Sequence, residues 1–473
     1  MSTHHDDAPD GAAGAVQRQT VLDQGPQPSG PVALVHGTVI DATGAPPLPN
    51  RTIVVEGDRI AALGPSDEVA VPADARVLDA TGMYVLPGLW DMHVHVFDDE
   101  HLPLFLLNGV TGVRHMGAAP VHHRWREQLV ANQLLAPRMV LASRIIDGPN
   151  PLRPNSIAVG DEQEAREAVR QSQRDGADFL KVYNLVPRKA YFALVDEARK
   201  RGIPFVGHVP LGVTVAEAAE AGQASIEHLE GVLPATSGQA NELHHRLAAL
   251  DVRGFDDMWE QHGLIQQAVD THDPARAGEL CARFAALGTW HVPTLAVLQA
   301  GAYAGSDAFP LAEYLPYVPA QLRKMWEMAQ NWRKTAEDRE KAARLFDHQL
   351  RIAGELHEAG VPLMAGTDTF VPGFSLHDEL ALLVRAGLTE MAALQSATRQ
   401  PARYLGLSDT FGTVAEGKAA DLLLLGADPL EDIGNTRDVR AVLLGGKLFD
   451  AAELDRMRAS TEERIAEHER RSE

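Results

Sequence analysis

Short apolar segments of strand pattern recur along the middle of the chain, and segments of helical pattern separate several of them. Strands that alternate with helices indicate βαβ units and a parallel sheet. Eight such repeats over about 320 residues predict an α/β protein with a (β/α)8 or TIM barrel that carries insertions. The eight expected strands are "YVLPGLWDMHVH" (84–95), "TGVRHMG" (111–117), "RMVLASRI" (138–145), "FLKVYN" (179–184), "IPFVGHVP" (203–210), "SIEHLEG" (225–231), "TWHVPTL" (289–295) and "PLMAGTD" (362–368).

A doubly wound sheet is the alternative to the barrel. It would usually carry a glycine-rich phosphate turn after its first strand, and no such turn follows residues 84–95. Two helices are expected between strands, over residues 161–175 and 187–201. Gly176 and Gly202 stand where a left-handed cap ends a helix.

Both flanks of this region have a different pattern, with β-branched runs broken by Gly and Asp. We therefore expect a small β-sandwich domain built from both chain ends. The predicted boundaries are a disordered tail (1–30), the β domain (31–85 with 408–450), the barrel (86–407) with a helical insertion at about 297–360, and a C-terminal helix or tail (451–473).

The acidic composition argues against two classes of binding partner. Nucleic acids and anionic membranes attract clustered Lys and Arg, so a net charge of −22 argues against both. The chain lacks an apolar run of about 18 residues, and its first 30 residues lack the pattern of a signal peptide, so we expect a cytoplasmic protein. The single cysteine, Cys281, excludes a disulfide within the chain and a cysteine-based zinc site.

Metal-binding or titratable residues stand at the ends of five expected strands. His93 and His95 share one face of the first strand because side chains alternate along a strand. Lys181 interrupts an apolar strand, where an unpaired charge is costly. The ends of parallel strands meet at one mouth of a barrel, so a single site is expected there. Its other members are His208, His228 and Asp368.

These residue types suit a divalent metal centre. Neutral imidazoles and carboxylates are ligands of Zn2+ and similar ions. A neutral lysine that takes up CO2 becomes a carbamate, an anionic oxygen donor able to bridge two ions. Two such ions can share a hydroxide at neutral pH, and Asp368 can take its proton and return it to a leaving group.

The constellation resembles the amidohydrolase superfamily, in the branch described as imidazolonepropionase-related or prolidase-like. That family pattern is a His-x-His on strand one, a carboxylated Lys on strand four, a His on each of strands five and six, and an Asp on strand eight. The sequence segments around these residues also match the family pattern. They are "LPGLWDMHVH", "GADFLKVYN", "VGHVP", "AGQASIEHLEG", "LMAGTDT" and "GTVAEGKAADLLLL". The resemblance covers residues 32 to 450.

Carried over by position, the resemblance implies two divalent metal ions, most simply zinc. His93, His95 and Asp368 would hold one ion, and His208 and His228 the other. Carboxylated Lys181 would bridge them, and Asp368 would act as general acid and base. The retained lysine argues against the mononuclear members of the superfamily.

Four further residues are candidates for the site. Tyr183 shares a face with Lys181 and can polarise a carbonyl, or it packs the barrel. His115 stands where relatives usually have Asp, and it is either a structural residue or a catalytic contact to the substrate. Arg153 is either a solvated loop residue or pairs with a substrate carboxylate, and Asp91 can orient a ligand.

Aromatic residues are dense in the expected insertion, where they either pack a helical layer or cover the barrel mouth. They are Tyr303, Phe309, Tyr314, Tyr317, Trp326 and Trp332.

The resemblance implies hydrolysis of an amide or peptide-like C–N bond by metal-activated hydroxide. The substrate would be a small molecule such as a dipeptide, an Xaa-Pro dipeptide or an N-acyl amino acid, including ochratoxin-like compounds. A lactone or phosphotriester hydrolase with the same centre is the alternative, and a non-catalytic barrel scaffold is a remote one. We also expect a homo-oligomer.

Overall fold

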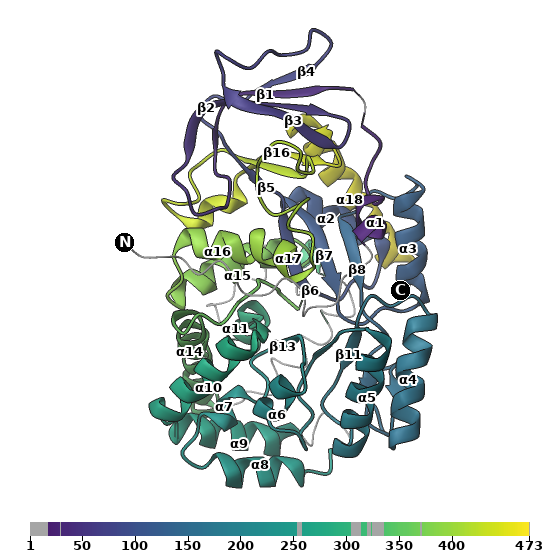
Figure 1. Cartoon of the computed structure of the whole chain (residues 1–473), viewed down its shortest axis with the longest axis vertical. Helices are drawn as coiled ribbons and strands as arrows, with labels where there is room; N and C mark the ends of the chain where they lie inside the picture. Colours follow the sequence, from purple (N-terminus) through teal and green to yellow (C-terminus); the bar gives the residue numbers. More distant parts are fainter. Residues whose placement is uncertain are drawn as a thin grey trace.

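The computed structural model describes residues 18–28, 30–252, 258–303, 314–318, 323, 335–368 and 371–472. Strands and helices alternate through the main body of the molecule, and a separate sheet lies at one end of it (Figure 1). The main body contains two parallel sheets, so the predicted α/β class is confirmed.

The two parallel sheets hold seven of the eight expected strands. The first consists of β6 (Leu89–Val94), β7 (Val110–His115) and β8 (Arg138–Leu141). The second has the order β10 (Ile157–Ala158), β9 (Ile146–Asp147), β11 (Leu180–Val182), β12 (Phe205–Gly207), β13 (Ser225–Glu227) and β14 (Trp290–Val292).

Backbone hydrogen bonds link the edges of the two sheets. The eighth expected strand, residues 362–368, lies between β14 and β6 and makes a single bridge at Leu363. The linking bonds run from Ser143 N to Phe179 O (2.8 Å), His291 N to Pro362 O (3.0 Å), Met92 N to Ala365 O (2.9 Å) and Asp368 N to His93 O (2.7 Å).

Helices surround these strands (Figure 1). The side chain of Asp161 accepts hydrogen bonds at the start of α4, and Gly202, in the left-handed region with φ 63°, ends α5, as predicted. The described helices of the main body are α2 (Leu102–Leu107), α3 (Pro120–Val130), α4 (Glu162–Arg174), α5 (Arg188–Arg201), α6 (Val215–Glu220), α7 (Val232–Ala235), α8 (Ala240–Ala248), α9 (Met258–Asp270), α10 (Pro274–Leu287), α11 (Leu295–Tyr303), α14 (Ala336–Glu358), α15 (Phe374–Arg385), α16 (Glu390–Ser396) and α17 (Arg399–Tyr404).

The sheet at the end of the molecule joins the two flanks of the chain. Its central contact is between β5 and β15, which are antiparallel, so the N-terminal and C-terminal flanks are hydrogen-bonded neighbours. The strands are β1 (Val32–Val39), β2 (Leu48–Glu56), β3 (Arg59–Pro65), β4 (Arg76–Asp79), β5 (Tyr84–Pro87), β15 (Leu422–Leu425), β16 (Val439–Leu444) and β17 (Lys447–Phe449).

The expected first strand, residues 84–95, is wrong as a single element. It divides at Gly88 into β5, which belongs to the end sheet, and β6, which belongs to the main body. A Cβ on Gly88 would lie 2.2 Å from the hydroxyl oxygen of Thr111, so only glycine permits the crossing. The Gly88 N–H donates to Asp421 O and the Leu89 N–H to Gly109 O, one toward each sheet.

Part of the expected disordered tail is ordered. Residues Arg18–Leu22 form the short helix α1, and Val21 and Gln24 are fully buried. Gln24 binds both backbone groups of Met139 through its side chain, and Arg138 donates to the carbonyl oxygen of Val21. The sequence did not reveal this because the polar, Gly- and Pro-rich composition of the tail hides a few anchoring residues.

The C-terminal residues form a helix, as one of the two expected alternatives. Helix α18 (Ala451–Ser472) packs against α2 and buries Leu454, Thr461 and Ile465.

Tyr314 and Tyr317 of the aromatic insertion contact the ring of Phe374. Phe309, Trp326 and Trp332 lie outside the described residues.

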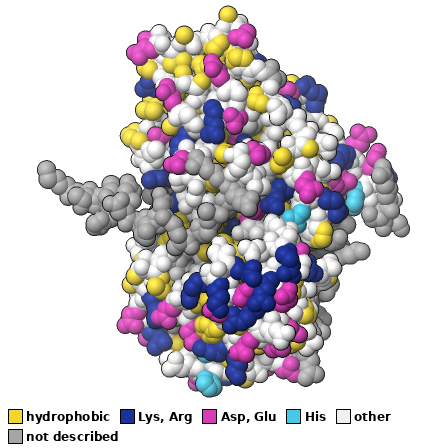
Figure 2. Space-filling model, turned by 45° about the vertical axis from the view of Figure 1, so that its right-hand side comes forward, with side chains coloured by type: hydrophobic (Ala, Val, Ile, Leu, Met, Phe, Trp, Pro, Cys, Tyr) yellow, Lys and Arg dark blue, Asp and Glu magenta, His cyan; other side chains and the backbone are white. Residues whose placement is uncertain are grey.

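Figure 2 shows basic and acidic side chains interleaved on the face that carries α4 and α5. Arg166 and Arg170 pair with carboxylates of the neighbouring helix, at 2.5 Å to Asp196 and 2.9 Å to Glu197.

Among the described helices, none is long and apolar enough to cross a membrane. The expectations on nucleic acid, oligomer and location stay predictions.

Candidate metal centre

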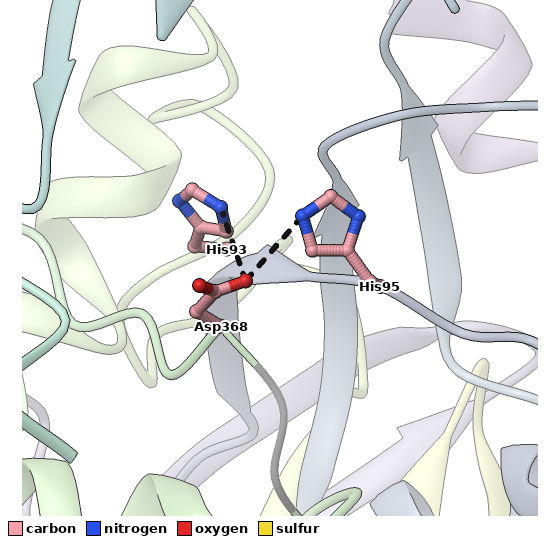
Figure 3. Close-up of side chains that lie close together, drawn as sticks. All are labelled: His93, His95 and Asp368. Atoms are coloured by element: carbon pink, nitrogen blue, oxygen red, sulfur yellow. Dashed lines mark ion pairs between the residues drawn. The ribbon is translucent and has the colours of Figure 1, made fainter. Parts of the chain in front are cut away.

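Three predicted ligands come together at the ends of β6 and the eighth segment. One potential ligand atom each from His93, His95 and Asp368 lies within 4.8 Å of the other two (Figure 3). The Nε2 atoms of His93 and His95 are 3.6 and 3.4 Å from the same carboxylate oxygen of Asp368. The His95 and Asp368 side chains are each 26% exposed, so the group is open to solvent on one side.

The rings of the other two predicted histidine ligands adjoin this group. The His228 ring centroid lies 4.6 Å from that of His93 and 4.7 Å from that of His208. His228 and Asp368 both have a positive φ, 59° and 56°, at the point where their strands end. Such backbone is costly outside glycine and is concentrated at functional sites.

Lys181 lies on β11 with its side chain fully buried. Its Nζ atom has no hydrogen-bond partner within the described part of the chain. Burial lowers the pKa of Lys181 to about 8, although the carboxylates of Glu227 and Asp368 act in the opposite direction. A large fraction of the Lys181 side chains is therefore in the neutral amine form at mildly alkaline pH.

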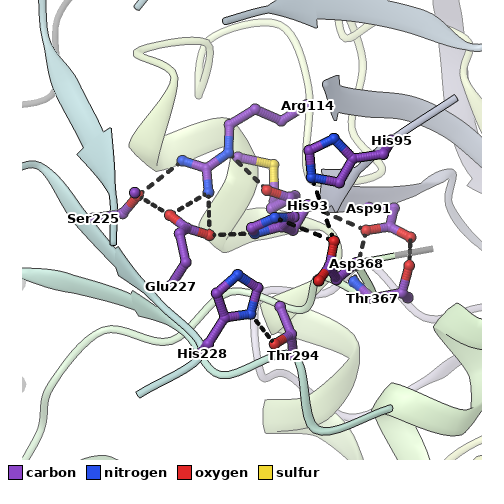
Figure 4. A network of polar contacts seen from close by, with 12 residues as sticks. Asp91, His93, His95, Arg114, Ser225, Glu227, His228, Thr294, Thr367 and Asp368 are labelled. Atoms are coloured by element: carbon purple, nitrogen blue, oxygen red, sulfur yellow. Dashed lines mark hydrogen bonds and ion pairs between the residues drawn. The ribbon is translucent and has the colours of Figure 1, made fainter. Parts of the chain in front are cut away.

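Three of the four predicted histidine ligands are held through their Nδ1 atoms by residues that were not predicted from the sequence. Figure 4 shows the contacts of His93 and His228. The partners are Glu227 for His93 (2.8 Å), Asn184 for His208 (2.5 Å) and Thr294 for His228 (2.7 Å). Partners of this kind fix the orientation of a ring and leave the opposite nitrogen for a metal.

Asp91 contacts the backbone of one predicted ligand and the residue before another. It accepts hydrogen bonds from the backbone N–H of His93 and from the backbone and hydroxyl of Thr367. It therefore ties β6 to the segment that carries Asp368, and its expected role in orienting a ligand would act through the backbone. Burial raises the pKa of Asp91 to about 7.

Tyr183 and Arg153 lie together beside the predicted ligands. The Tyr183 ring is 4.1 Å from that of His208, and Arg153 Nε donates to the Tyr183 hydroxyl at 3.5 Å. Burial raises the pKa of Tyr183, and the neighbouring Arg153 guanidinium acts in the opposite direction.

His115 is buried against the segment that follows His95. It is 2% exposed, its Nε2 accepts a hydrogen bond from the Val96 N–H, and its ring packs 4.0 Å from that of His122. It contacts the segment that follows His95, with 5.9 Å between the two ring centroids. These contacts favour the structural alternative for His115, and its role stays a prediction.

The residues present fit a divalent metal. Burial lowers the pKa of His95 to about 3 and holds the pKa values of His93, His208 and His228 well below their usual range, so these rings are neutral donors. His93 Nε2 and Lys181 Nζ are buried without hydrogen-bond partners among the described residues. Burial also raises the pKa of Asp368 to about 6.

Comparison with known proteins identifies the family. The model of the Amidohydrolase family matches residues 84–449. An imidazolonepropionase from Ralstonia nicotianae is 25% identical over 412 residues, which cover 83% of this chain and 90% of that protein. An ochratoxinase from Aspergillus niger is 36% identical over 110 residues, so this chain spans only 23% of that relative, and 22% of this chain is matched.

Solved structures of amidohydrolase and prolidase type are also similar to this chain. A bottromycin amidohydrolase has a TM-score of 0.74 at 28% identity, over 97% of this chain and 94% of that one. A putative prolidase from Bifidobacterium longum has a TM-score of 0.63 at 25% identity, over 91% of this chain and 99% of that one. With its histidines, lysine and aspartate at the ends of parallel strands, this chain belongs to the amidohydrolase family.

Proposed function

We propose that this protein is a metal-dependent hydrolase that cleaves an amide or peptide-like C–N bond. One observation carries the proposal: among the described residues, the buried Nε2 of His93, 3.6 Å from Asp368, and the buried Nζ of Lys181 have no hydrogen-bond partner. Buried polar atoms are nearly always hydrogen-bonded, so a buried atom without a partner can indicate a bound ion or water molecule. A pair of divalent ions would supply partners for both.

His93, His95 and Asp368 would hold one ion, and His208 and His228 the other. Lys181, carboxylated by CO2, would bridge them, for which its buried amine with a lowered pKa gives support. Zinc suits a set made mostly of imidazoles. When bound, the ions would make a water molecule acidic enough to act as a nucleophile near neutral pH and would polarise the scissile carbonyl.

The residues of the chain supply the proton transfers and the positioning. Asp368 accepts the proton of the attacking water and delivers it to the departing nitrogen, a role that suits a carboxylate of raised pKa. The Tyr183 hydroxyl donates to the carbonyl oxygen as negative charge develops there. Arg153, beside Tyr183, binds the free carboxylate of the substrate.

We infer a dipeptide or an N-acyl amino acid as the substrate. The support is Arg153 beside the centre and the names of the similar proteins, which include a putative prolidase and an ochratoxinase. Arginine binds a carboxylate through two parallel N–H donors, so a free carboxylate next to the scissile bond would orient the substrate.

We also propose that the eight parallel segments close into a barrel and that the end sheet folds over as a sandwich. The backbone bonds at Ser143, His291 and Met92 support closure because they link every pair of neighbouring segments that the sheets leave open. A separate apolar cluster shared by β1, β2, β15 and β16 supports the sandwich. Apart from the ordered residues 18–28 of the expected tail, the domain boundaries given from the sequence remain our proposal.

A panel of dipeptides, N-acyl amino acids, lactones and phosphotriesters on zinc-loaded protein tests the function. We expect amide substrates with a free carboxylate to have the highest kcat/KM. Lactone or phosphotriester turnover that far exceeds every amide would overturn the amide assignment. Protein that holds well under one ion per chain and hydrolyses nothing after zinc or cobalt is added would overturn the metal-dependent function.

A further inference from the structure

A buried ion pair lies beneath the predicted metal centre. Arg114 on β7 and Glu227 on β13 are both fully buried, and Arg114 Nη2 donates to both carboxylate oxygens of Glu227, at 2.9 and 3.0 Å. Figure 4 shows the pair next to the His93 ring. A buried ion pair is not in itself stabilising, because removing two charges from water costs about as much as their attraction returns. Its presence therefore calls for another explanation.

The Glu227 carboxylate accepts four hydrogen bonds. Two come from Arg114, one comes from the Ser225 hydroxyl at 2.5 Å, and one comes from His93 Nδ1 at 2.8 Å. A carboxylate offers only acceptors, so His93 Nδ1 must carry its proton. A neutral imidazole with a proton on Nδ1 has its lone pair on Nε2, the atom that faces Asp368.

Arg114 also fixes the backbone next to His93. Its Nε donates at 2.7 Å to the carbonyl oxygen of Met92, the residue before His93 on β6. Its guanidinium lies over the rings of Phe179 and Tyr404, at 5.6 and 5.2 Å from their centroids. The arginine therefore couples the position of Glu227 on β13 to the position of His93 on β6.

We propose that Glu227 and Arg114 are positioning residues that set the tautomer and orientation of His93 for metal binding. The inference rests on the proposed metal-dependent function. Among the three histidines held through Nδ1, His93 alone is held by a carboxylate, whereas an amide and a hydroxyl hold His208 and His228. A carboxylate partner makes the imidazole a stronger donor to a metal.

Glutamine at position 227 cannot replace this arrangement. One of its two terminal positions would be an NH2 group. Turned toward His93, that group would force Nδ1 to accept and Nε2 to carry the proton, which blocks metal binding. Turned toward Ser225, it would place donors against Arg114. Either orientation breaks the network without changing the size of the side chain.

The protein contains a matched control at the other end of the barrel strands. Asp421 and Arg138 form a second buried pair with two parallel contacts, at 2.6 and 3.0 Å, and neither contacts a predicted ligand. Asp421→Asn therefore repeats the chemical change of Glu227→Gln in a buried pair away from the centre.

The experiment measures zinc affinity by competition with a chromophoric chelator, the absorption spectrum of the cobalt-loaded protein and the unfolding transition, for the wild type and both variants. We expect Glu227→Gln to weaken binding of the tighter ion by about 10- to 100-fold and to alter the cobalt spectrum. We expect Asp421→Asn to lower stability and leave affinity and spectrum unchanged. Wild-type affinity and spectrum in Glu227→Gln, or equal losses of affinity in both variants, would overturn the proposal.

A second measurement does not depend on the folding of a variant. Metal-free wild-type protein with 15N-labelled histidine rings should show His93 protonated at Nδ1 and bare at Nε2, and the opposite tautomer would overturn the proposal. Wild-type protein that binds no zinc would instead refute the metal-dependent function, whereas a bound metal with the wrong His93 tautomer would refute only the positioning role.

Discussion

Gly366 lies against His93 so closely that a Cβ on Gly366 would be 2.8 Å from the His93 backbone nitrogen and 2.9 Å from its Cβ. Two residues further on, the Asp368 N–H donates to the His93 carbonyl oxygen at 2.7 Å. The absence of a side chain at position 366 therefore lets the segment carrying Asp368 approach the strand carrying His93.

Replacing Gly366 with alanine should separate these two ligands. We expect Gly366→Ala to lower the free energy of unfolding by about 1–3 kcal/mol, as overpacking does, and to weaken metal binding. Gly278→Ala is the control, because Gly278 is an exposed helix residue with no neighbour within 4 Å of an added Cβ and should gain up to about 1 kcal/mol. Calorimetry and metal titration check both, and unchanged metal affinity in Gly366→Ala would contradict the argument.

The sequence pattern was sufficient to locate seven of the eight expected strands in the parallel sheets and to predict that three candidate ligands lie together. Each ligand stands at the end of a short apolar segment, and such segments are specified by local composition. His93, His95 and Asp368 consequently came together as expected. The pattern failed at residues 84–95, where the transfer between sheets at Gly88 depends on a close contact with Thr111 of β7, and local composition does not show such a tertiary contact.

The partners of the ligands were harder to predict. Arg114 in "TGVRHMG" and Glu227 in "SIEHLEG" are charges inside apolar strands, which is the same signal that identified Lys181. Applying that rule to every strand would have found them both. Asn184 and Thr294 carry no such signal, because amides and hydroxyls near strand ends are common and only the tertiary structure shows which ring they contact.

Lys181→Met should separate function from stability. We expect loss of the second metal ion and of activity, but a more stable metal-free protein, because a buried charge is replaced by an apolar side chain of similar size. The pKa of Lys181 is about 8 in the folded protein and 10.5 in the unfolded protein. Between these two pH values the unfolded state binds more protons than the folded state. The free-energy cost of burying the charged lysine is therefore largest below pH 8. The gain should be up to about 3 kcal/mol there and should disappear as the pH rises through 8 to 10.5.

Denaturant unfolding of the metal-free protein at several pH values measures this gain, and Lys189→Ala on the exposed surface of α5 is the control that should change neither stability nor metal content. A gain that does not depend on pH would show that the burial of the Lys181 charge is not its source. An intact mass for the wild type that exceeds the sequence mass by one CO2 would report the carbamate directly.

Metal removal should inactivate and destabilise the protein together. A ligand that binds only the folded state stabilises it by about 2.7 kcal/mol at 100 times its Kd, so adding zinc to chelated protein should raise Tm with increasing zinc concentration. We expect His95→Ala to lose most of that rise, since His95 is one of the three grouped donors. His245→Ala, an exposed histidine on α8, should keep it. An equal rise in both variants would place the bound zinc elsewhere.

Tyr183 and Arg153 should affect different kinetic constants. If the Tyr183 hydroxyl stabilises charge that develops on the carbonyl oxygen, Tyr183→Phe should lower kcat by about 100- to 1,000-fold with little change in KM. Arg153→Met should instead raise KM for substrates with a free carboxylate and leave KM for the same compounds as methyl amides unchanged. Steady-state kinetics on matched acid and amide substrates checks both. Because Arg153 Nε contacts the Tyr183 hydroxyl, the double variant should lose less than the product of the single losses, and full multiplicativity would show that the two side chains act independently.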